Sequence, residues 1–302
     1  SGSMSVRMTS GSGFMYPYSS AADSSGDVYV GQYWTYGIKK FTYSTAAVDT
    51  SFASGGTYKG SGNCRSYYPM NIKIHNGYMY VASYYQHRVF RVNLSTGACD
   101  WNHYIRYARN IAIGNNILYA TGYYGNAVIR NLSNNSNISC SWSGNLKSYT
   151  DYGSMAVDAS GNNLYGFEFN YIYRFPINQS NKCPSTGWAS RIRMSSPYIF
   201  GADSHPSDDK ILYVNNYYSH RIEKITLNTS LNGTQSLSTA GRCCTGKSSS
   251  SNIRMYYPWG LSVDKTNNRI ISSNYYKMSV QAFDLNLAWQ KEFGGSSSTR
   301  MD

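Results

Sequence analysis

Charged residues are scarce in this chain, and acidic residues are the scarcest. Only 14% of the 302 residues are charged, and 15 Asp and Glu stand against 27 Lys and Arg, so the formal net charge is +12. Metal-dependent enzymes hold their ion with several convergent carboxylates or histidines, and that supply is missing here. We therefore expect no metal and no cofactor, while the positive charge predicts attraction to polyanions.

Long apolar runs and zinc-binding cysteine spacings are also missing. No stretch approaches the roughly 18 apolar residues of a membrane-spanning helix, so we expect no transmembrane segment. The six cysteines, at positions 64, 99, 140, 183, 243 and 244, form no CxxC pair. Their even number favours disulfides in an oxidising compartment over buried free thiols. The adjacent Cys243 and Cys244 either join partners elsewhere or form a strained ring with each other.

The polarity that is present comes from hydroxyl and amide groups. The chain has 46 Ser, 17 Thr and 28 Asn, together with 31 Tyr. Strong helix formers are scarce, whereas β-branched, aromatic and turn-forming residues are abundant. This composition predicts an all-β protein.

One pattern occurs six times along the chain. It consists of a short apolar strand, a turn rich in Gly, Asn or Asp, a second strand such as LYV, an aromatic pair, and a third strand that begins near a basic residue. The second strands align at Tyr29, Tyr80, Tyr119, Tyr165, Tyr213 and Ile271. Steps of about 40 to 60 residues are the spacing of propeller blades.

Each copy supplies three strands, and the variable stretch before the next copy supplies a fourth. A four-stranded sheet that recurs six times buries both its faces by packing sheet on sheet around an axis. We predict one six-bladed β-propeller domain over residues 1–302, with four-stranded antiparallel blades. Its inner strands are expected to start near residues 21, 71, 110, 155, 201 and 261.

The last copies resemble a known repeat. The segment PWGLSVDKTNNRIISSNYYKMSVQAF, from Pro258, is similar to an NHL repeat. That repeat runs Pro, Gly, an apolar strand ending in Val-Asp, a turn, a second strand, then Asn-x-Arg and a third strand ending in Phe. The segments NYYSHRIEKI at 216–225 and SYYQHRVFRV at 83–92 resemble the Asn-His-Arg-Ile part of the same motif. The resemblance implies a six-bladed propeller that serves as an RNA-binding, protein-binding or enzymatic scaffold.

The aromatic pairs are expected on one face of the propeller. In an antiparallel blade, the loops between the second and third strands emerge on the same face as the connections to the next blade. We call this the aromatic face, and the opposite one the turn face. The pairs are Tyr33-Trp34, Tyr84-Tyr85, Tyr123-Tyr124, Tyr217-Tyr218 and Tyr275-Tyr276, with Phe169 and Tyr171 in the fourth copy.

The connections between blades bring a cation to the same face. The segment NIRMYYPWG carries Arg254 in front of Tyr256 and Tyr257, and the other connections supply Arg7, Arg65, Arg106, Lys147 and Arg193. Arginine offers a planar fork for carboxylate, sulfate or phosphate and stacks on rings. Such a set predicts a binding surface, although arginines at repeat positions also pack on neighbouring blades. Arg88 and Arg221, beside His87 and His220, fit the structural alternative best.

The turn face has a pattern of its own. Several third strands end in Asn followed two residues later by Ser, which is a glycosylation sequon. The candidate sites are Asn93, Asn131, Asn134, Asn137, Asn178, Asn228 and Asn232. Chance explains most of their number, but their placement at turns would leave the aromatic face open.

No arrangement of residues indicates catalysis. No GxSxG motif organises a Ser-His-Asp triad, and Glu168 in GFEFNY is a lone carboxylate among aromatic residues. We expect a non-catalytic, extracellular or cell-surface propeller that binds a glycan, polyanion or protein through its aromatic face. The alternatives are a cytoplasmic NHL module that binds single-stranded RNA and, less favoured, a lyase or hydrolase built around Glu168.

Overall fold

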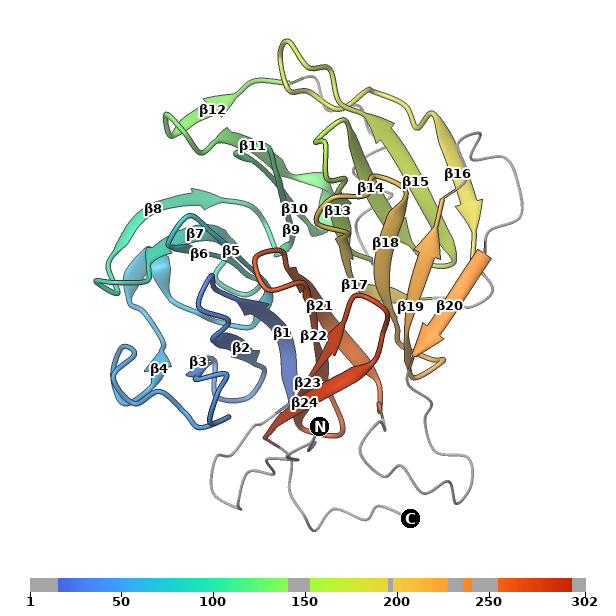
Figure 1. Ribbon diagram of the computed structural model, residues 1–302. Helices are drawn as coiled ribbons and strands as arrows, with labels where there is room; N and C mark the ends of the chain where they lie inside the picture. Colours follow the sequence, from blue (N-terminus) through green and yellow to red (C-terminus); the bar gives the residue numbers. More distant parts are fainter. Residues whose placement is uncertain (1–15, 141–152, 195–197, 228–235, 241–254, 295–302) are drawn as a thin grey trace.

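Six four-stranded antiparallel sheets follow one another along the chain and surround a central axis as the blades of a propeller (Figure 1). The computed structural model describes residues 16–140, 153–194, 198–227, 236–240 and 255–294, with the backbone alone for 236–240. The predicted all-β, six-bladed fold is confirmed. None of the helices in these ranges is long and apolar enough to cross a membrane.

Each blade is built from four consecutive strands, numbered from the axis outward. Blade 1 contains β1 (Pro17–Ala22), β2 (Val28–Gln32), β3 (Ile38–Phe41) and β4 (Thr57–Tyr58); blade 2 contains β5 (Pro69–His75), β6 (Tyr78–Ser83), β7 (Arg88–Asn93) and β8 (Cys99–Tyr104); blade 3 contains β9 (Ala108–Gly114), β10 (Ile117–Gly122), β11 (Ala127–Asn131) and β12 (Ser136–Ile138). Short 3-10 turns occupy Gly62–Cys64 and Tyr123–Gly125.

The second half of the ring follows the same order. Blade 4 contains β13 (Met155–Val157), β14 (Asn163–Glu168), β15 (Tyr171–Pro176) and β16 (Ser190–Arg193); blade 5 contains β17 (Ile199–Ser204), β18 (Ile211–Asn216), β19 (Arg221–Thr226) and β20 (Ser236–Ala240); blade 6 contains β21 (Pro258–Asp264), β22 (Arg269–Asn274), β23 (Ser279–Asp284) and β24 (Trp289–Gly294).

The repeat position in each second strand forms part of the packing between blades. Tyr29, Tyr80, Tyr119, Tyr165, Tyr213 and Ile271 expose at most 3% of their surface. Burial of such large side chains removes apolar area from water and stabilises the contact between sheets. The apolar core is accordingly divided into six clusters, each shared by two neighbouring blades.

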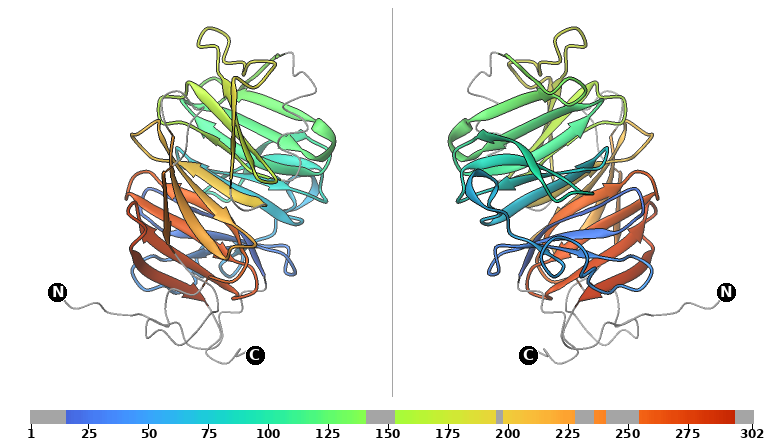
Figure 2. Two further views of the ribbon diagram at one scale, coloured as in Figure 1. Left: turned by 90° about the vertical axis from the view of Figure 1, so that its right-hand side faces the viewer. Right: turned by 90° about the vertical axis from the view of Figure 1, so that its left-hand side faces the viewer.

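The ring closes through side-chain packing between its first and last blades. Val28 and Phe41 of blade 1 share one cluster with Ile271 and Phe293 of blade 6. Figure 2 shows β1–β4 beside β21–β24 from two sides. All four strands of blade 6 come from residues 258–294.

One ion pair crosses the axis. Lys73 on β5 and Asp203 on β17 belong to opposite blades, and their Nζ and Oδ2 atoms lie 2.5 Å apart. Burial favours a higher pKa for Asp203, but the ammonium groups of Lys73 and Lys265 and the N–H of Val263 outweigh it and hold the pKa of that carboxyl below its usual range. Asp203 therefore stays ionised in the ring.

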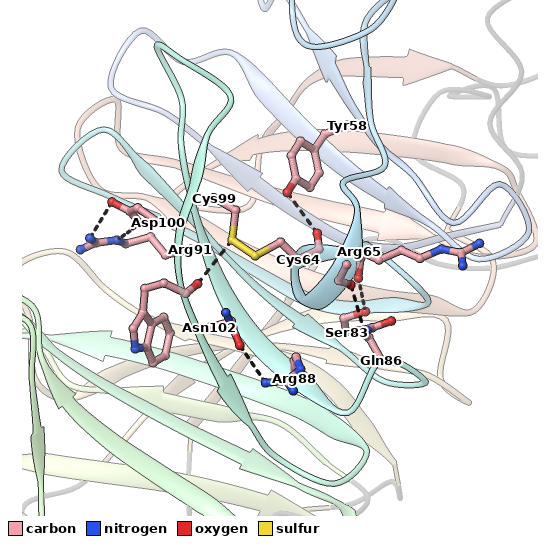
Figure 3. The surroundings of a disulfide bond; sticks show 12 residues. Tyr58, Cys64, Arg65, Ser83, Gln86, Arg88, Arg91, Cys99, Asp100 and Asn102 are labelled. Atoms are coloured by element: carbon pink, nitrogen blue, oxygen red, sulfur yellow. Dashed lines mark hydrogen bonds and ion pairs between the residues drawn. A yellow bond between two sulfur atoms is a disulfide. The ribbon is translucent and has the colours of Figure 1, made fainter.

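Two disulfides join neighbouring blades at the outer rim. Cys64, in the connection that follows blade 1, is bonded to Cys99 at the start of β8, and Cys140, just after β12, is bonded to Cys183 in the turn before β16. Figure 3 shows the first of them, where the Tyr58 hydroxyl donates a hydrogen bond to the Cys64 carbonyl at 3.1 Å. Cys243 and Cys244 lie outside the described residues.

Candidate binding face

The aromatic pairs lie in the loops between second and third strands, where one member packs and the other faces solvent. The first residue of each pair, such as Tyr84 or Tyr217, is half-buried. The second residue is exposed in all six blades, by 40 to 61% of its surface: Trp34, Tyr85, Tyr124, Phe169, Tyr218 and Tyr276. Tyr171, which the sequence placed beside Phe169, lies on β15. Six exposed rings therefore surround the axis on one face.

A backbone hydrogen bond joins each of these loops to the connection that leads into its blade. The N–H of Tyr84, for example, donates to the carbonyl of Tyr68 at 3.0 Å, and that of Tyr217 donates to the carbonyl of Tyr198 at 3.1 Å. The same bond recurs for Tyr33 with Tyr16, Tyr123 with Tyr107 and Tyr275 with Tyr257. Loops and connections therefore form one continuous surface in these five blades.

The connection tyrosines have a left-handed backbone. Their φ angles lie between 50° and 70°, at Tyr16, Tyr68, Tyr107, Tyr198 and Tyr257. Glycine or asparagine adopts this conformation at lower cost than a residue with a large side chain. Residues held in such conformations cluster at functional sites, because the surrounding structure must impose them. The recurrence of Tyr at a strained position supports a role for the ring itself.

Three of the predicted cations can be placed, and all three are exposed on this face: Arg65, Arg106 and Arg193. The guanidinium of Arg106 lies 4.9 Å from the ring centre of Tyr124 and 5.6 Å from that of Tyr107, while that of Arg65 lies 5.4 Å from Tyr67. Figure 3 shows the Arg65 side chain extending away from the disulfide at Cys64. No carboxylate in the described ranges forms an ion pair with the three arginines. Arg7, Lys147 and Arg254 lie outside the described residues.

Other cations at the edge of this face hold the blades in place. Arg88 donates to Asn102 Oδ1 at 2.7 Å, and Arg221 pairs with the buried Glu223 at 2.6 Å. The neighbouring histidines accept hydrogen bonds through Nδ1, His87 from the N–H of Tyr107 at 2.9 Å and His220 from the N–H of Tyr257 at 3.0 Å. These residues fix the loops that carry the exposed rings.

Burial keeps the phenols of the face in their neutral form. Burial, followed by nearby phenols, raises the pKa of Tyr18, Tyr217 and Tyr275 above the ordinary value of a tyrosine. At neutral pH these hydroxyls are therefore hydrogen-bond donors as well as acceptors. The face presents flat apolar rings with polar edges beside guanidinium groups.

Sequence reasoning missed a set of inner-strand residues at the centre of this face. Trp259 stacks on Phe200 with ring centres 4.2 Å apart and an angle of 6° between the planes, and Tyr18 lies 4.5 Å from Trp259. The sequence contains a signal for them, since each stands two residues after a left-handed Tyr, in YPY, YIF and YPW.

The turn face carries the sequons that the structure describes. Asn93 and Asn131 end β7 and β11, Asn134 lies in the turn that follows β11, and Asn178 follows β15. Asn137 lies on β12, where its Oδ1 accepts a hydrogen bond from Arg130. Asn93 and Asn134 each accept a hydrogen bond from the hydroxyl of their sequon Ser. Asn228 and Asn232 lie outside the described residues.

The acidic residues of the turn face are engaged in structural contacts. Asp158 accepts the N–H groups of Asn162 and Asn163, and Asp264 pairs with Arg269 at 2.8 Å. In the described part of the chain, no group of three His, Cys, Asp or Glu side chains is arranged to hold a metal ion. Glu168 ends β14 on the aromatic face and is half-buried.

Comparison with known proteins shows the fold. No family model and no curated protein matches the chain. It is similar to the structure of selenomethionine-substituted virginiamycin B lyase from Staphylococcus aureus, with 15% identity, a TM-score of 0.55, and 92% of this chain and 84% of that chain covered. A streptogramin B lyase matches with 14% identity, a TM-score of 0.57, and coverage of 94% and 84%.

A hydrazine synthase structure from Kuenenia stuttgartiensis matches as well, with 12% identity, a TM-score of 0.57, and coverage of 93% and 80%. At these identities the likeness extends to the propeller fold alone, because one fold supports many unrelated activities. The NHL resemblance stays a prediction.

Proposed function

We propose that this chain is an extracellular propeller that binds an acidic glycan through its aromatic face. The observation that carries the proposal is the pairing of exposed rings with arginines that have no acidic partner in the described ranges. Aromatic rings with polar edges suit the flat faces of sugars, and guanidinium groups suit carboxylate and sulfate. The net charge of +12 favours the approach of an anionic polymer.

The repetition of the face argues for a polymer over a single small molecule. Each blade presents an exposed ring at the same position, so a chain with recurring sugar units could make similar contacts with successive blades. Single-stranded RNA is also a repeating anion and also stacks on aromatic rings. The two disulfides favour an oxidising compartment, in which an extracellular glycan is the more accessible partner.

A lyase is the second candidate, because two of the similar structures are named as lyases. Glu168 is the carboxylate at the aromatic face that such a reaction would use as an acid or base. Turnover of an acidic polysaccharide, measured by the appearance of new chain ends, would be lost in a Glu168→Gln variant under this reading. The binding proposal expects intact polymer after prolonged incubation with the protein.

Binding to a heparin polymer in a salt titration tests the proposed function. We expect the triple variant Arg65→Gln/Arg106→Gln/Arg193→Gln to bind more weakly and to lower the slope of log K against log salt by about one per arginine. The matched control, Lys182→Gln/Lys210→Gln/Lys265→Gln, removes the same charge from the turn face and should leave most of the affinity. Equal losses in both variants, or tighter binding to single-stranded RNA of equal charge, would count against the proposal.

A further inference from the structure

In five of the six blades, the inner strand carries a β-bulge at the end that lies on the aromatic face. Pro17 pairs with Gln32 and Ser19 with Gly31, so Tyr18 is the extra residue of the inner strand, and the same register shift makes Met70, Arg109 and Phe200 the extra residues in blades 2, 3 and 5. In blade 6 the shift lies between Pro258 and Leu261 and includes Trp259. Bulges of this kind redirect a side chain and are concentrated next to binding and catalytic sites.

Ring contacts between blades place these side chains around the axis. Tyr18, Trp259 and Phe200 form a continuous aromatic arc across blades 1, 6 and 5. The guanidinium of Arg109, on blade 3, lies 5.7 Å from the ring centre of Phe200 on blade 5. Blades 3 and 5 are not neighbours, so this contact requires both side chains to reach toward the centre. We call Tyr18, Met70, Arg109, Phe200 and Trp259 the axial ring.

Blade 4 contributes no side chain to the axial ring. Its equivalent position is Gly153, since Ser154 and Gly201 stand at matching places before their inner strands. A Cβ atom on Gly153 would lie 1.4 Å from the carbonyl oxygen of Phe167, so no larger residue fits there. The Arg109 side chain of blade 3 therefore meets the Phe200 ring of blade 5 with no side chain of blade 4 at the equivalent position.

The axial ring carries a positive charge, which a cluster of purely apolar packing residues would not. Its five side chains include one guanidinium and no carboxylate, and Trp259, Phe200 and Arg109 are each partly exposed on the aromatic face. The Lys73–Asp203 pair crosses the axis three residues further along β5 and β17, or about 10 Å deeper at the usual rise of a strand. The ring is therefore backed by a paired charge and opens toward the aromatic face.

We propose that the axial ring binds one acidic sugar unit of the glycan, with the sugar against Trp259 and its carboxylate or sulfate on Arg109, while the buried Tyr18 supports Trp259 from the side. This inference rests on the proposed function and deepens it. The partly exposed Trp259 offers an apolar ring surface, and the guanidinium of Arg109, on the Phe200 ring next to it, is a planar, bidentate donor for an oxyanion. In this arrangement Arg65, Arg106 and Arg193 bind the polymer along the face, and the axial ring discriminates acidic from neutral sugar units.

Short oligosaccharides distinguish binding at the axial ring from binding by the outer arginines, Arg65, Arg106 and Arg193. A tetrasaccharide of alternating glucuronate and N-acetylglucosamine, its carboxyl-reduced neutral counterpart, and a sulfated heparin tetrasaccharide serve as probes. We expect Arg109→Gln to weaken the two acidic probes by about tenfold or more and to leave the neutral probe unchanged, because only the charge-assisted bonds are lost. Arg109→Lys should restore part of the affinity. The probe that loses more identifies carboxylate or sulfate as the preferred group.

The matched control is Arg106→Gln on the rim, which should weaken the long polymer more than the tetrasaccharides. Trp259→Phe provides a second readout that does not depend on the stability of an Arg109 variant. It keeps a ring for stacking, so acidic probes should still bind, but the change in tryptophan fluorescence on tetrasaccharide binding should become smaller than in the wild type, which has five other tryptophans. Two results would overturn the binding site at the axial ring: unchanged tetrasaccharide binding in Arg109→Gln, or an unchanged fluorescence signal in Trp259→Phe. If polymer binding still depended on Arg65, Arg106 and Arg193, the proposed function would stand. Absence of any polymer binding in the wild type would overturn the proposed function.

Discussion

His87 and His220 each join an aromatic loop to the connection that leads into the next blade by accepting a hydrogen bond on a ring nitrogen. Protonation of that nitrogen would remove the acceptor. Each uses Nδ1 to accept the N–H of a left-handed tyrosine. Burial lowers the pKa of His87, with a further contribution from the nearby charge of Arg106, and burial lowers the pKa of His220. Both rings are therefore neutral at pH 7 and able to accept.

From these hydrogen bonds we predict that the free energy of unfolding decreases in mild acid. Because their folded-state pKa values lie below the unfolded value of about 6.5, their contribution is complete above that pH and decreases as the pH falls below it. We expect His87→Asn/His220→Asn, in which an amide oxygen can take the acceptor role, to lose less free energy of unfolding between pH 6.5 and 5 than the wild type. Urea denaturation at several pH values measures this. The remaining histidines are common to both proteins, so parallel curves would show that the two acceptors do not titrate.

Single residues show what the sequence could and could not predict about the site. The repeat placed Tyr84 and Tyr85 in one loop because the aromatic pair follows a clear apolar strand. It gave no indication that Tyr107 and Tyr257 are left-handed, because positive φ is indicated in sequence by Gly or Asn and seldom by Tyr. The separate roles of Arg106 and Arg109, three residues apart, depend on a bulge that side-chain periodicity alone does not show.

At the scale of strands, the inner strands start earlier than the sequence predicted in most blades. Proline begins β1, β5 and β21, where the missing N–H is tolerated at the first position of a strand. The bulge that follows interrupts the apolar alternation, so the pattern becomes readable only after it. For the same reason, the residues of the axial ring fell outside the strands that alternation could predict.

Both disulfides link neighbouring blades at similar places, which could not be predicted from the sequence. Each joins a segment near the fourth strand of one blade to the turn before the fourth strand of the next, with separations of 35 and 43 residues. Spacing alone leaves several pairings open, because connectivity depends on which rim segments face each other. Once the blades are placed, Cys64 has Cys99 within reach, and Cys140 has Cys183.

Removal of one disulfide should loosen one junction between blades. We expect Cys64→Ser/Cys99→Ser to lower the free energy of unfolding by about 2 to 4 kcal/mol, since it releases a constraint on the unfolded chain. Amide hydrogen exchange should become faster in Gly62–Tyr68 and β8 while blade 4 changes little. The corresponding Cys140→Ser/Cys183→Ser variant should show the reverse distribution. A uniform increase in exchange over all blades would mean that the disulfides do not act on separate junctions.

At the scale of the whole molecule, the two faces have different chemistry. The aromatic face carries exposed rings and the arginines Arg65, Arg106 and Arg193, for which no acidic partner lies in the described ranges, whereas the turn face carries the five described sequons and acidic residues engaged in structural contacts. The fold was predictable because six equivalent sheets have few ways to bury both faces. The ligand was not, because it depends on side chains brought to the axis from five different blades.

The arrangement of disulfides and sequons makes a final prediction about compartment. In protein secreted from its source or from a eukaryotic host, alkylation without prior reduction should leave Cys64, Cys99, Cys140 and Cys183 unlabelled. Peptide mass spectrometry should also find glycans among Asn93, Asn131, Asn134, Asn137 and Asn178, whose turns lie away from the aromatic face. Enzymatic deglycosylation should then leave glycan-polymer affinity unchanged, since the binding surface is on the other side of the ring. If all four cysteines are alkylated and no sequon carries a glycan, the extracellular placement is wrong, and RNA becomes the stronger candidate for the same face.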